Sequence, residues 1–233
     1  MAARSSRVID ALEVFGFAAA RFFLTRALAA ARSLVDLSFF SLFANPLLLA
    51  AVWLGVLKAR RQRWAAYGLY RPRPLLRYVG YGVLLFLVIV GLQRFGDPVL
   101  DALARAVGGD PAAHGRQYAH LEGNLGATLG MVALVWLFAA IGEEVFFRGL
   151  LFTKLASVLG DGRAAWAVAW LLQALIFGLQ HQGSGTAAVV NSTVSGLIYG
   201  AAFLLWKRNL LPVVLAHGLW DTFGLTMLYF GRG

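Results

Sequence analysis

The chain contains no cysteine among its 233 residues. It therefore forms no disulfide and offers no thiol nucleophile. Charged residues are scarce as well, at 14% of the chain, whereas a soluble domain of this length carries about a quarter. The weak ten-residue alternation of a transmembrane β-barrel is missing. So is a short apolar core followed by a cleavage site, and no removable signal peptide is expected.

Hydrophobic residues make up 60% of the chain, and the mean hydropathy is +0.70. These values predict an all-α fold, a polytopic transmembrane bundle of about six to eight helices. The net charge of +10 comes mainly from arginines between the apolar runs, which indicates membrane topology and no nucleic-acid partner. A composition rich in Ala, Arg, Leu and Gly is typical of a bacterial protein, so the expected location is the bacterial inner membrane.

Five regions have the roughly 20 apolar residues that a spanning helix needs. They are 37–57, 78–95, 164–181, 186–206 and 209–230. A sixth region, 127–157, is predicted to be either one tilted helix or two pieces that meet near Gly142 or Gly149. Because no internal repeat or low-complexity linker interrupts the chain, residues 1–233 are expected to form a single membrane domain.

The charges between these regions predict the topology. Segment 58–77 carries seven basic residues and no acid, which places it in the cytoplasm. The predicted loop 97–123 is richer in acids and suits the opposite side, and Lys207 and Arg208 return the chain to the cytoplasm. The N-terminal stretch 7–33 is either an amphipathic helix at the interface or a seventh span with its polar face toward the bundle. Topology favours the seventh span.

A helical wheel of that stretch shows one polar face. Arg7, Asp10, Glu13, Arg21 and Arg32 share it, and Arg26 does not.

The stretch AAIGEEVFFRGLLF, residues 139–152, places three charges in one apolar segment. Each charge at the centre of a spanning helix costs about 2.5–3.5 kcal/mol, so these side chains are candidate functional residues. Glu144 and Arg148 stand at i, i+4 with the acid first, which predicts an ion pair. Glu143 lies about 100° round the helix and is expected to stay without a counter-ion.

Two more polar pairs occur in other predicted spans: Phe177 with His181 in FGLQH, and His217 with Asp221 in HGLWD. A buried carboxylate without a counter-ion can act as a base near neutrality, and a neutral histidine can hold water or polarise a carbonyl. The three clusters together predict a site that activates water inside a membrane.

Other polar residues favour simpler interpretations. The remaining histidines, His114 and His120, fall in the predicted outer loop. Asn191 and Ser195 share a face of span 186–206, and ordinary helix packing is favoured over a place in the same cavity.

The order Glu-Glu-x-x-x-Arg, Phe-x-x-x-His, His-x-x-x-Asp, in separate helices, resembles the CPBP (Abi) family of intramembrane glutamic endopeptidases, which includes CAAX prenyl proteases and bacteriocin-processing proteins. The motifs cover about residues 143–221. The resemblance implies a catalytic core over 124–233, preceded by variable N-terminal helices and a loop over 1–123.

The resemblance also implies catalytic roles. Glu143 would activate the attacking water, Glu144 would assist it, and His181 would bind or polarise the water. His217 and Asp221 would stabilise the oxyanion.

Two further residues would support this site, and one position departs from the eukaryotic branch. Arg148 would support Glu144, and Phe177 would pack beneath the site. Asp221 stands where the eukaryotic prenyl endopeptidases have Asn, and an ionised Asp cannot donate to an oxyanion. Either Asp221 is protonated or it orients His217, and the change argues against prenylated substrates.

One geometric expectation conflicts with this site. If span 164–181 crossed the membrane fully, His181 would lie near the outer surface, whereas His217 lies about 10 Å inside the cytoplasmic end of its span. For the two to meet, at least one helix must be offset, tilted or broken.

The expected partners are the lipid bilayer and a membrane-embedded or membrane-anchored peptide, and no cofactor or metal is expected. Two alternatives stay open: a zinc-dependent version of the protease, and a non-catalytic immunity, scaffold or transport protein. Glu-Glu-x-x-x-Arg lacks the His-Glu-x-x-His spacing of a zinc protease. The sequence does not define the oligomeric state.

Overall fold

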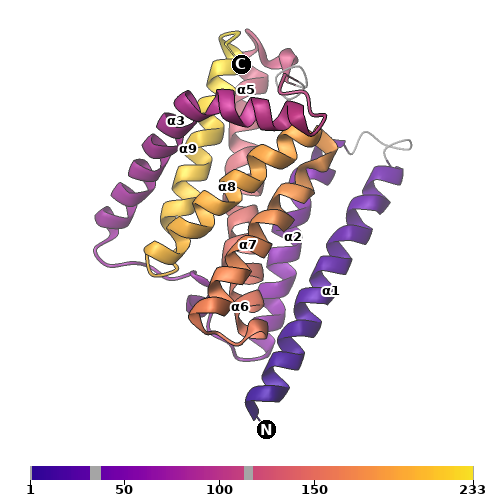
Figure 1. Ribbon diagram of the computed structural model, residues 1–233, viewed down its shortest axis with the longest axis vertical. Helices are drawn as coiled ribbons and strands as arrows, with labels where there is room; N and C mark the ends of the chain where they lie inside the picture. The colour runs from indigo at the N-terminus through magenta and orange to yellow at the C-terminus, as the bar shows by residue number, and fades with distance from the viewer. Residues whose placement is uncertain (1, 32–37, 113–117, 233) are drawn as a thin grey trace.

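The computed structural model describes residues 2–31, 38–112 and 118–232, and every regular element within these residues is helical. This confirms the predicted all-α fold. The long helices lie side by side in one bundle, and the two ends of the chain lie at opposite ends of it (Figure 1).

Five helical stretches are long and apolar enough to cross a membrane, and the chain is a multi-pass membrane protein. They are Leu75–Ala106, Leu125–Leu159, Arg163–Ser184, Thr186–Leu205 and Leu210–Tyr229. Each overlaps a predicted span. The remaining predicted span, 37–57, coincides with helix α2, Ser38–Ala59, of which the apolar part Pro46–Ala59 is shorter. Residue 37 itself lies outside the described residues.

The segment predicted over 127–157 is one continuous helix. Helices α5 (Leu125–Leu134), η3 (Val135–Phe152) and α6 (Thr153–Leu159) follow one another without a break. η3 is wound as a π-helix, with i→i+5 hydrogen bonds, a winding that is rare and concentrated at functional sites. It includes the whole charged stretch singled out from the sequence.

Gly142 and Gly149 do not break this helix but let neighbours approach it. A Cβ at Gly142 would lie 2.9 Å from the Leu47 Cβ of α2, and one at Gly149 would lie 2.8 Å from the Tyr67 carbonyl oxygen. The absence of side chains at these two positions therefore seats η3 closely against α2 and η1 (Trp64–Tyr67).

Helix α3, Leu75–Ala106, is longer than the predicted span 78–95, and the prediction that 97–123 is a loop was wrong for its first ten residues. Asp101 and Arg105 form an i, i+4 ion pair of 3.5 Å, so charged residues continue the helix. Pro98 lies within the helix and cannot donate a backbone hydrogen bond. Figure 1 shows the last part of α3 turning across the end of the bundle.

The rest of that predicted loop is only partly described. His120 lies in the short helix η2, Ala119–Leu121. His114 and Arg116 fall outside the described residues.

Helices α7 and α8 form a closely packed antiparallel pair. α7 (Arg163–Leu179) leads through η4 (Gln180–Ser184) into α8 (Thr186–Leu205), and α9 (Leu210–Tyr229) follows. A Cβ at Gly178 would lie 1.9 Å from Thr193 Oγ1, and one at Gly196 would lie 2.9 Å from the Ala174 Cα. Small residues thus allow the two backbones to approach, as is typical of membrane helices. Thr193 belongs to the polar stretch of the sequence for which packing was the favoured interpretation.

The two basic segments meet at one end of the bundle. The Leu210 amide donates to the Gly68 carbonyl at 3.2 Å, and the Asn209 side chain donates to the Tyr70 carbonyl at 2.9 Å. At the other end of α9, the Gly123 amide donates to the Tyr229 carbonyl at 3.0 Å. Segments 58–77 and 207–208 therefore lie at the opposite end from residue 123, as the topology predicted. That the basic end is cytoplasmic stays a prediction.

Helix α1, Ala2–Ala31, lies along the bundle and packs against α2 and α6 (Figure 1). Its acidic residues contact a buried lysine of α6. Lys154 Nζ lies 2.6 Å from Asp10 Oδ1 and 2.8 Å from Glu13 Oε2. Arg60, directly after α2, pairs with Glu13, and Ser157 Oγ donates to Asp10 at 2.7 Å. Two acids and two bases thus join α1, α6 and the end of α2 in one network.

The polar face of α1 is therefore turned toward the bundle, which is the arrangement expected of the seventh-span alternative. Asp10 is 4% exposed and Lys154 2%, while Arg7 on the same helix is exposed. Crossing of the membrane by α1 remains a prediction, because α1 is not among the five long apolar helices. Arg32 lies outside the described residues, and the contacts of the Arg26 side chain are not described.

The substitution Lys154→Met tests this network. It leaves the carboxylates of Asp10 and Glu13 with one cation, Arg60, and breaking a buried ion pair from one side costs about 3–5 kcal/mol. We expect a clearly lower melting temperature for the detergent-solubilised protein, followed by tryptophan fluorescence.

The matched control is Lys58→Met, which removes an exposed lysine from α2. Adding Glu13→Gln to Lys154→Met should recover part of the loss, since it restores charge balance. Equal melting temperatures for Lys154→Met and Lys58→Met would contradict the network's structural role.

Candidate active site

The three charged residues of η3 are buried inside the bundle. Glu144 and Arg148 are fully buried, and Glu143 is 5% exposed. Arg148 Nη1 donates to Glu144 Oε1 at 2.9 Å, which confirms the ion pair predicted from their spacing. Because charges without partners are costly in the membrane, this pairing makes the segment tolerable there.

Glu144 also joins η3 to α9. His217 Nδ1 donates to the same oxygen, Oε1, at 2.8 Å. The other ring nitrogen, Nε2, lies 3.5 Å from Asp221 Oδ2, one turn further along α9. A continuous polar chain therefore runs from Arg148 through Glu144 and His217 to Asp221.

Two aromatic rings enclose the cation of this chain. The Arg148 guanidinium lies 4.1 Å from the centroid of Phe177 and 5.3 Å from that of Tyr199. Tyr199 of α8 also stacks on His217, at 5.2 Å between centroids. Such cation–π contacts stabilise a desolvated cation by about 2 kcal/mol. Phe177 thus packs against Arg148, and Tyr199 adds a contact that sequence analysis missed.

His181 is held by its own helix end. Its Nδ1 lies 2.9 Å from the Phe177 carbonyl oxygen, and its ring contacts the Phe177 ring edge to face at 5.0 Å. Since a carbonyl only accepts, Nδ1 carries the proton, and Nε2 of the neutral ring is left as an acceptor. His181 also lies within electrostatic range of His217 and Arg148.

The depth conflict raised by the sequence is resolved by the placement of α7 and α8. Figure 1 shows this pair tilted against α9, with the α7–α8 turn well below the end of the bundle where α9 finishes. His181 lies in η4, at the turn of that pair, and within electrostatic range of His217 of α9. The tilt agrees with the expectation that one helix must be offset, tilted or broken for the two histidines to meet, and Arg163–Ser184 remains long and apolar enough to cross the membrane.

Glu143 has different partners from Glu144. Gln180 Nε2, from η4, donates to Glu143 Oε1 at 3.2 Å. The Gln180 side chain in turn accepts a hydrogen bond from Arg21 of α1. Sequence analysis missed Gln180, although it stands beside His181, and placed Arg21 on the polar face of the N-terminal helix without linking it to the site.

The donor set does not suit a resident metal ion. Among the described residues, no three His, Asp or Glu side chains are grouped as metal ligands. Oε1 of Glu144 is shared by Arg148 and His217, and a guanidinium one turn away repels a dication.

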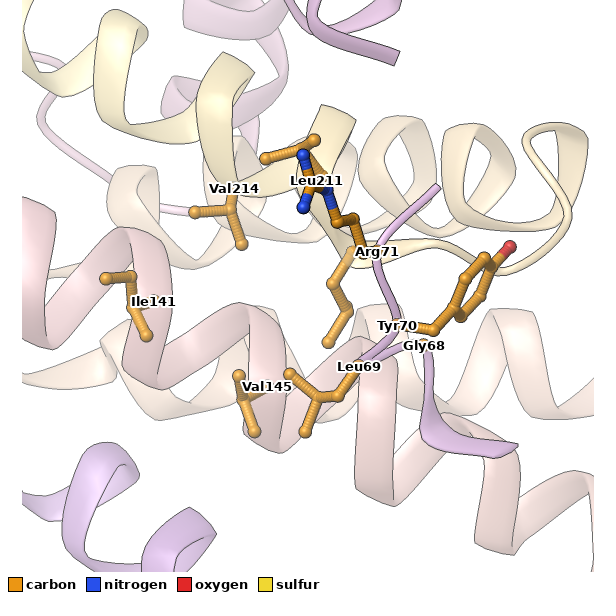
Figure 2. Close-up of a pocket in the computed structure, with 9 residues that line it drawn as sticks. Gly68, Leu69, Tyr70, Arg71, Ile141, Val145, Leu211 and Val214 are labelled. Carbon is orange, nitrogen blue, oxygen red and sulfur yellow. The ribbon is translucent and has the colours of Figure 1, made fainter. Parts of the chain in front are cut away.

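An open cavity of about 400 Å³ lies between the segment after η1, helix η3 and the start of α9. Figure 2 shows Ile141 and Val145 on one wall and Val214 and Leu211 on the other, with Arg71 at the rim. The same two helices carry Glu144 and His217. The cavity is thus mostly apolar and adjoins the elements of the polar chain.

Comparison with known families finds a match in the C-terminal part of the chain. Residues 125–223 match the family model described as "Rce1-like: Type II CAAX prenyl endopeptidase Rce1-like". The matched region contains all the motif residues, from Glu143 to Asp221. Comparisons with curated proteins and with solved structures find no match to the chain. Over residues 125–223, this multi-pass membrane protein therefore carries a domain of the Rce1-like type II CAAX prenyl endopeptidase family, as its motifs indicated.

Proposed function

We propose that the protein is an intramembrane endopeptidase that hydrolyses a peptide bond in a membrane-embedded or membrane-anchored substrate. The observation that carries this proposal is the contrast between two adjacent buried carboxylates. Glu144 is neutralised by Arg148 and bound by His217, whereas Glu143 accepts its hydrogen bond from the neutral amide of Gln180. Glu143 is thereby the carboxylate able to exchange a proton.

In the proposed reaction, Glu143 takes a proton from water while the water oxygen bonds to the carbonyl carbon of the substrate. The carbonyl electron pair moves to oxygen and forms an oxyanion. When the oxyanion collapses, the C–N bond breaks, and Glu143 returns the proton to the leaving amine. A general base of this kind contributes about 10²–10⁴-fold to the rate.

The histidines take complementary roles in this proposal. His181 Nε2 accepts a hydrogen bond from the attacking water, because Nδ1 donates to the Phe177 carbonyl. His217 Nδ1 donates to Glu144, and its Nε2 lies at the limit of hydrogen-bonding distance from Asp221. In this proposal the ring is protonated at both nitrogens, between the carboxylates of Glu144 and Asp221, and Nε2–H is the donor that stabilises the oxyanion. Asp221 orients the ring, a role that an ionised Asp fills without donating a hydrogen bond.

The apolar cavity is the proposed binding site for part of the substrate. We propose that the apolar part of the substrate occupies it, since its walls belong to η3 and α9, which carry Glu144 and His217. Its rim residue Arg71 lies at the basic end of the bundle, which we place in the cytoplasm of a bacterial cell, with the protein in the inner membrane. The Asp at 221 favours substrates other than prenylated proteins.

Glu143→Gln is the first test of the proposed function. It preserves shape and removes the base, so cleavage should fall by at least about 10²-fold. Peptide termini in membrane fractions should be compared between cells that express equal amounts of wild type and Glu143→Gln. A terminus that disappears in the variant also identifies the substrate.

The control is Glu122→Gln, which changes an exposed glutamate. Its termini should equal those of the wild type. Identical termini in wild type and Glu143→Gln, with the substrate compartment well sampled, would favour a non-catalytic immunity, scaffold or transport function.

Chelation separates the glutamate mechanism from a metal-dependent one. Because the donor set is poorly suited to a dication, the purified protein should cleave the identified peptide at an unchanged rate in excess EDTA and 1,10-phenanthroline. Loss of activity that zinc restores would establish the metalloprotease alternative.

Filling the cavity tests substrate placement. Ile141→Trp should raise KM at least about tenfold and leave kcat close to the wild-type value, because it occupies apolar space without touching the polar chain. Leu137→Trp, one turn earlier on η3 and outside the cavity, is the matched control. Equal KM values for the two variants would place the substrate elsewhere.

A further inference from the structure

We propose that Arg21 of helix α1, acting through the side chain of Gln180, positions and polarises Glu143, so that a helix outside the family-matched region completes the site. The inference rests on the proposed function. It assigns a task to the N-terminal helix, whose Arg21 lies more than a hundred residues before the matched segment begins at residue 125.

The contacts form a relay with a defined direction. Arg21 Nη2 donates to Gln180 Oε1, and Gln180 Nε2 donates to Glu143 Oε1 at 3.2 Å. An amide accepts through oxygen and donates through nitrogen. The cation of Arg21 therefore fixes the orientation of the Gln180 amide, and the amide presents its donor to Glu143.

The rings of η3 hold Arg21 in place. Its guanidinium lies 5.5 Å from the Phe147 centroid and 5.9 Å from that of Phe146. Both phenylalanines are buried, and only Val145 separates them from the glutamate pair along η3. Arg21 is thus packed against the element that carries Glu143.

The position of Arg21 along the bundle is set by the buried ion network of α1. Asp10 and Glu13 attach α1 to Lys154 of α6. Arg21 stands eight residues after Glu13, about 12 Å further along the helix axis. Docking of α1 at one level therefore places Arg21 at the level of Gln180.

Several charged or titratable groups act on Glu143. Arg21 reaches it from α1, His217 and Asp221 from α9, Tyr199 from α8, and Glu144 and Arg148 from η3 itself. Arg148 and His217 both bind Glu144. Arg21 is distinguished from them because its path to Glu143 runs through Gln180 and does not involve Glu144.

Carbodiimide labelling tests the relay without any substrate. Dicyclohexylcarbodiimide, an apolar reagent, modifies protonated carboxyl groups, and fragment-ion mass spectrometry separates Glu143 from Glu144. Loss of a nearby cation disfavours the carboxylate, so labelling of Glu143 in Arg21→Met should persist to a pH about one unit higher than in the wild type. Arg21→Lys, which keeps the charge, should shift less.

Three further variants complete the test. Gln180→Leu removes the hydrogen bond to Glu143 and should also raise the labelling midpoint. The double variant Arg21→Met/Gln180→Leu should shift the labelling midpoint little more than the larger of the two single shifts, because both changes interrupt the same path. Arg7→Met, an exposed arginine of the same helix, should leave the midpoint unchanged.

An unchanged midpoint in folded Arg21→Met would overturn the inference, and if that variant does not fold, an unchanged midpoint in Gln180→Leu would do so. Failure of the proposed function is distinguishable, because it would appear as undiminished cleavage by Glu143→Gln. Labelling of Glu143 does not depend on cleavage.

Discussion

The site depends on one pair of hydrogen bonds: Oε1 of Glu144 accepts from both Arg148 and His217. This pair neutralises a buried acid, holds η3 against α9 and fixes the ring of His217 at once. In a low-dielectric interior, leaving any one of these groups alone would be expensive. Because Arg148 balances the charge of Glu144, its neighbour Glu143 can be directed elsewhere, toward Gln180.

Two polar systems of different character thus lie in one membrane bundle. The network of Asp10, Glu13, Arg60 and Lys154 is balanced in charge and joins α1, α6 and the turn that follows α2. The chain around Glu144 joins η3 and α9 and borders an apolar cavity. The first sets the position of α1, and α1 carries Arg21 to Gln180, which binds Glu143 beside the second. The ion pairs that attach α1 to α6 therefore also determine where Arg21 lies relative to Gln180.

The depth of the α7–α8 pair is a second constraint. Gly178 and Gly196 let the two helices approach closely, and the pair sits tilted against α9 (Figure 1). The turn of this pair carries both Gln180 and His181 into the interior. There Gln180 binds Glu143, and His181 lies within electrostatic range of His217.

The sequence by itself determined the helical membrane class, the pairing of Glu144 with Arg148 and the family of the motif-bearing half. These follow from hydropathy and from i, i+4 spacing, which are local properties of a helix. Only the tertiary structure decided that His217 shares Glu144, 73 residues away, and that Arg21 reaches Gln180 across 159 residues. Such contacts depend on the tilt, depth and rotation of whole helices, which packing between their side chains sets and no local pattern encodes.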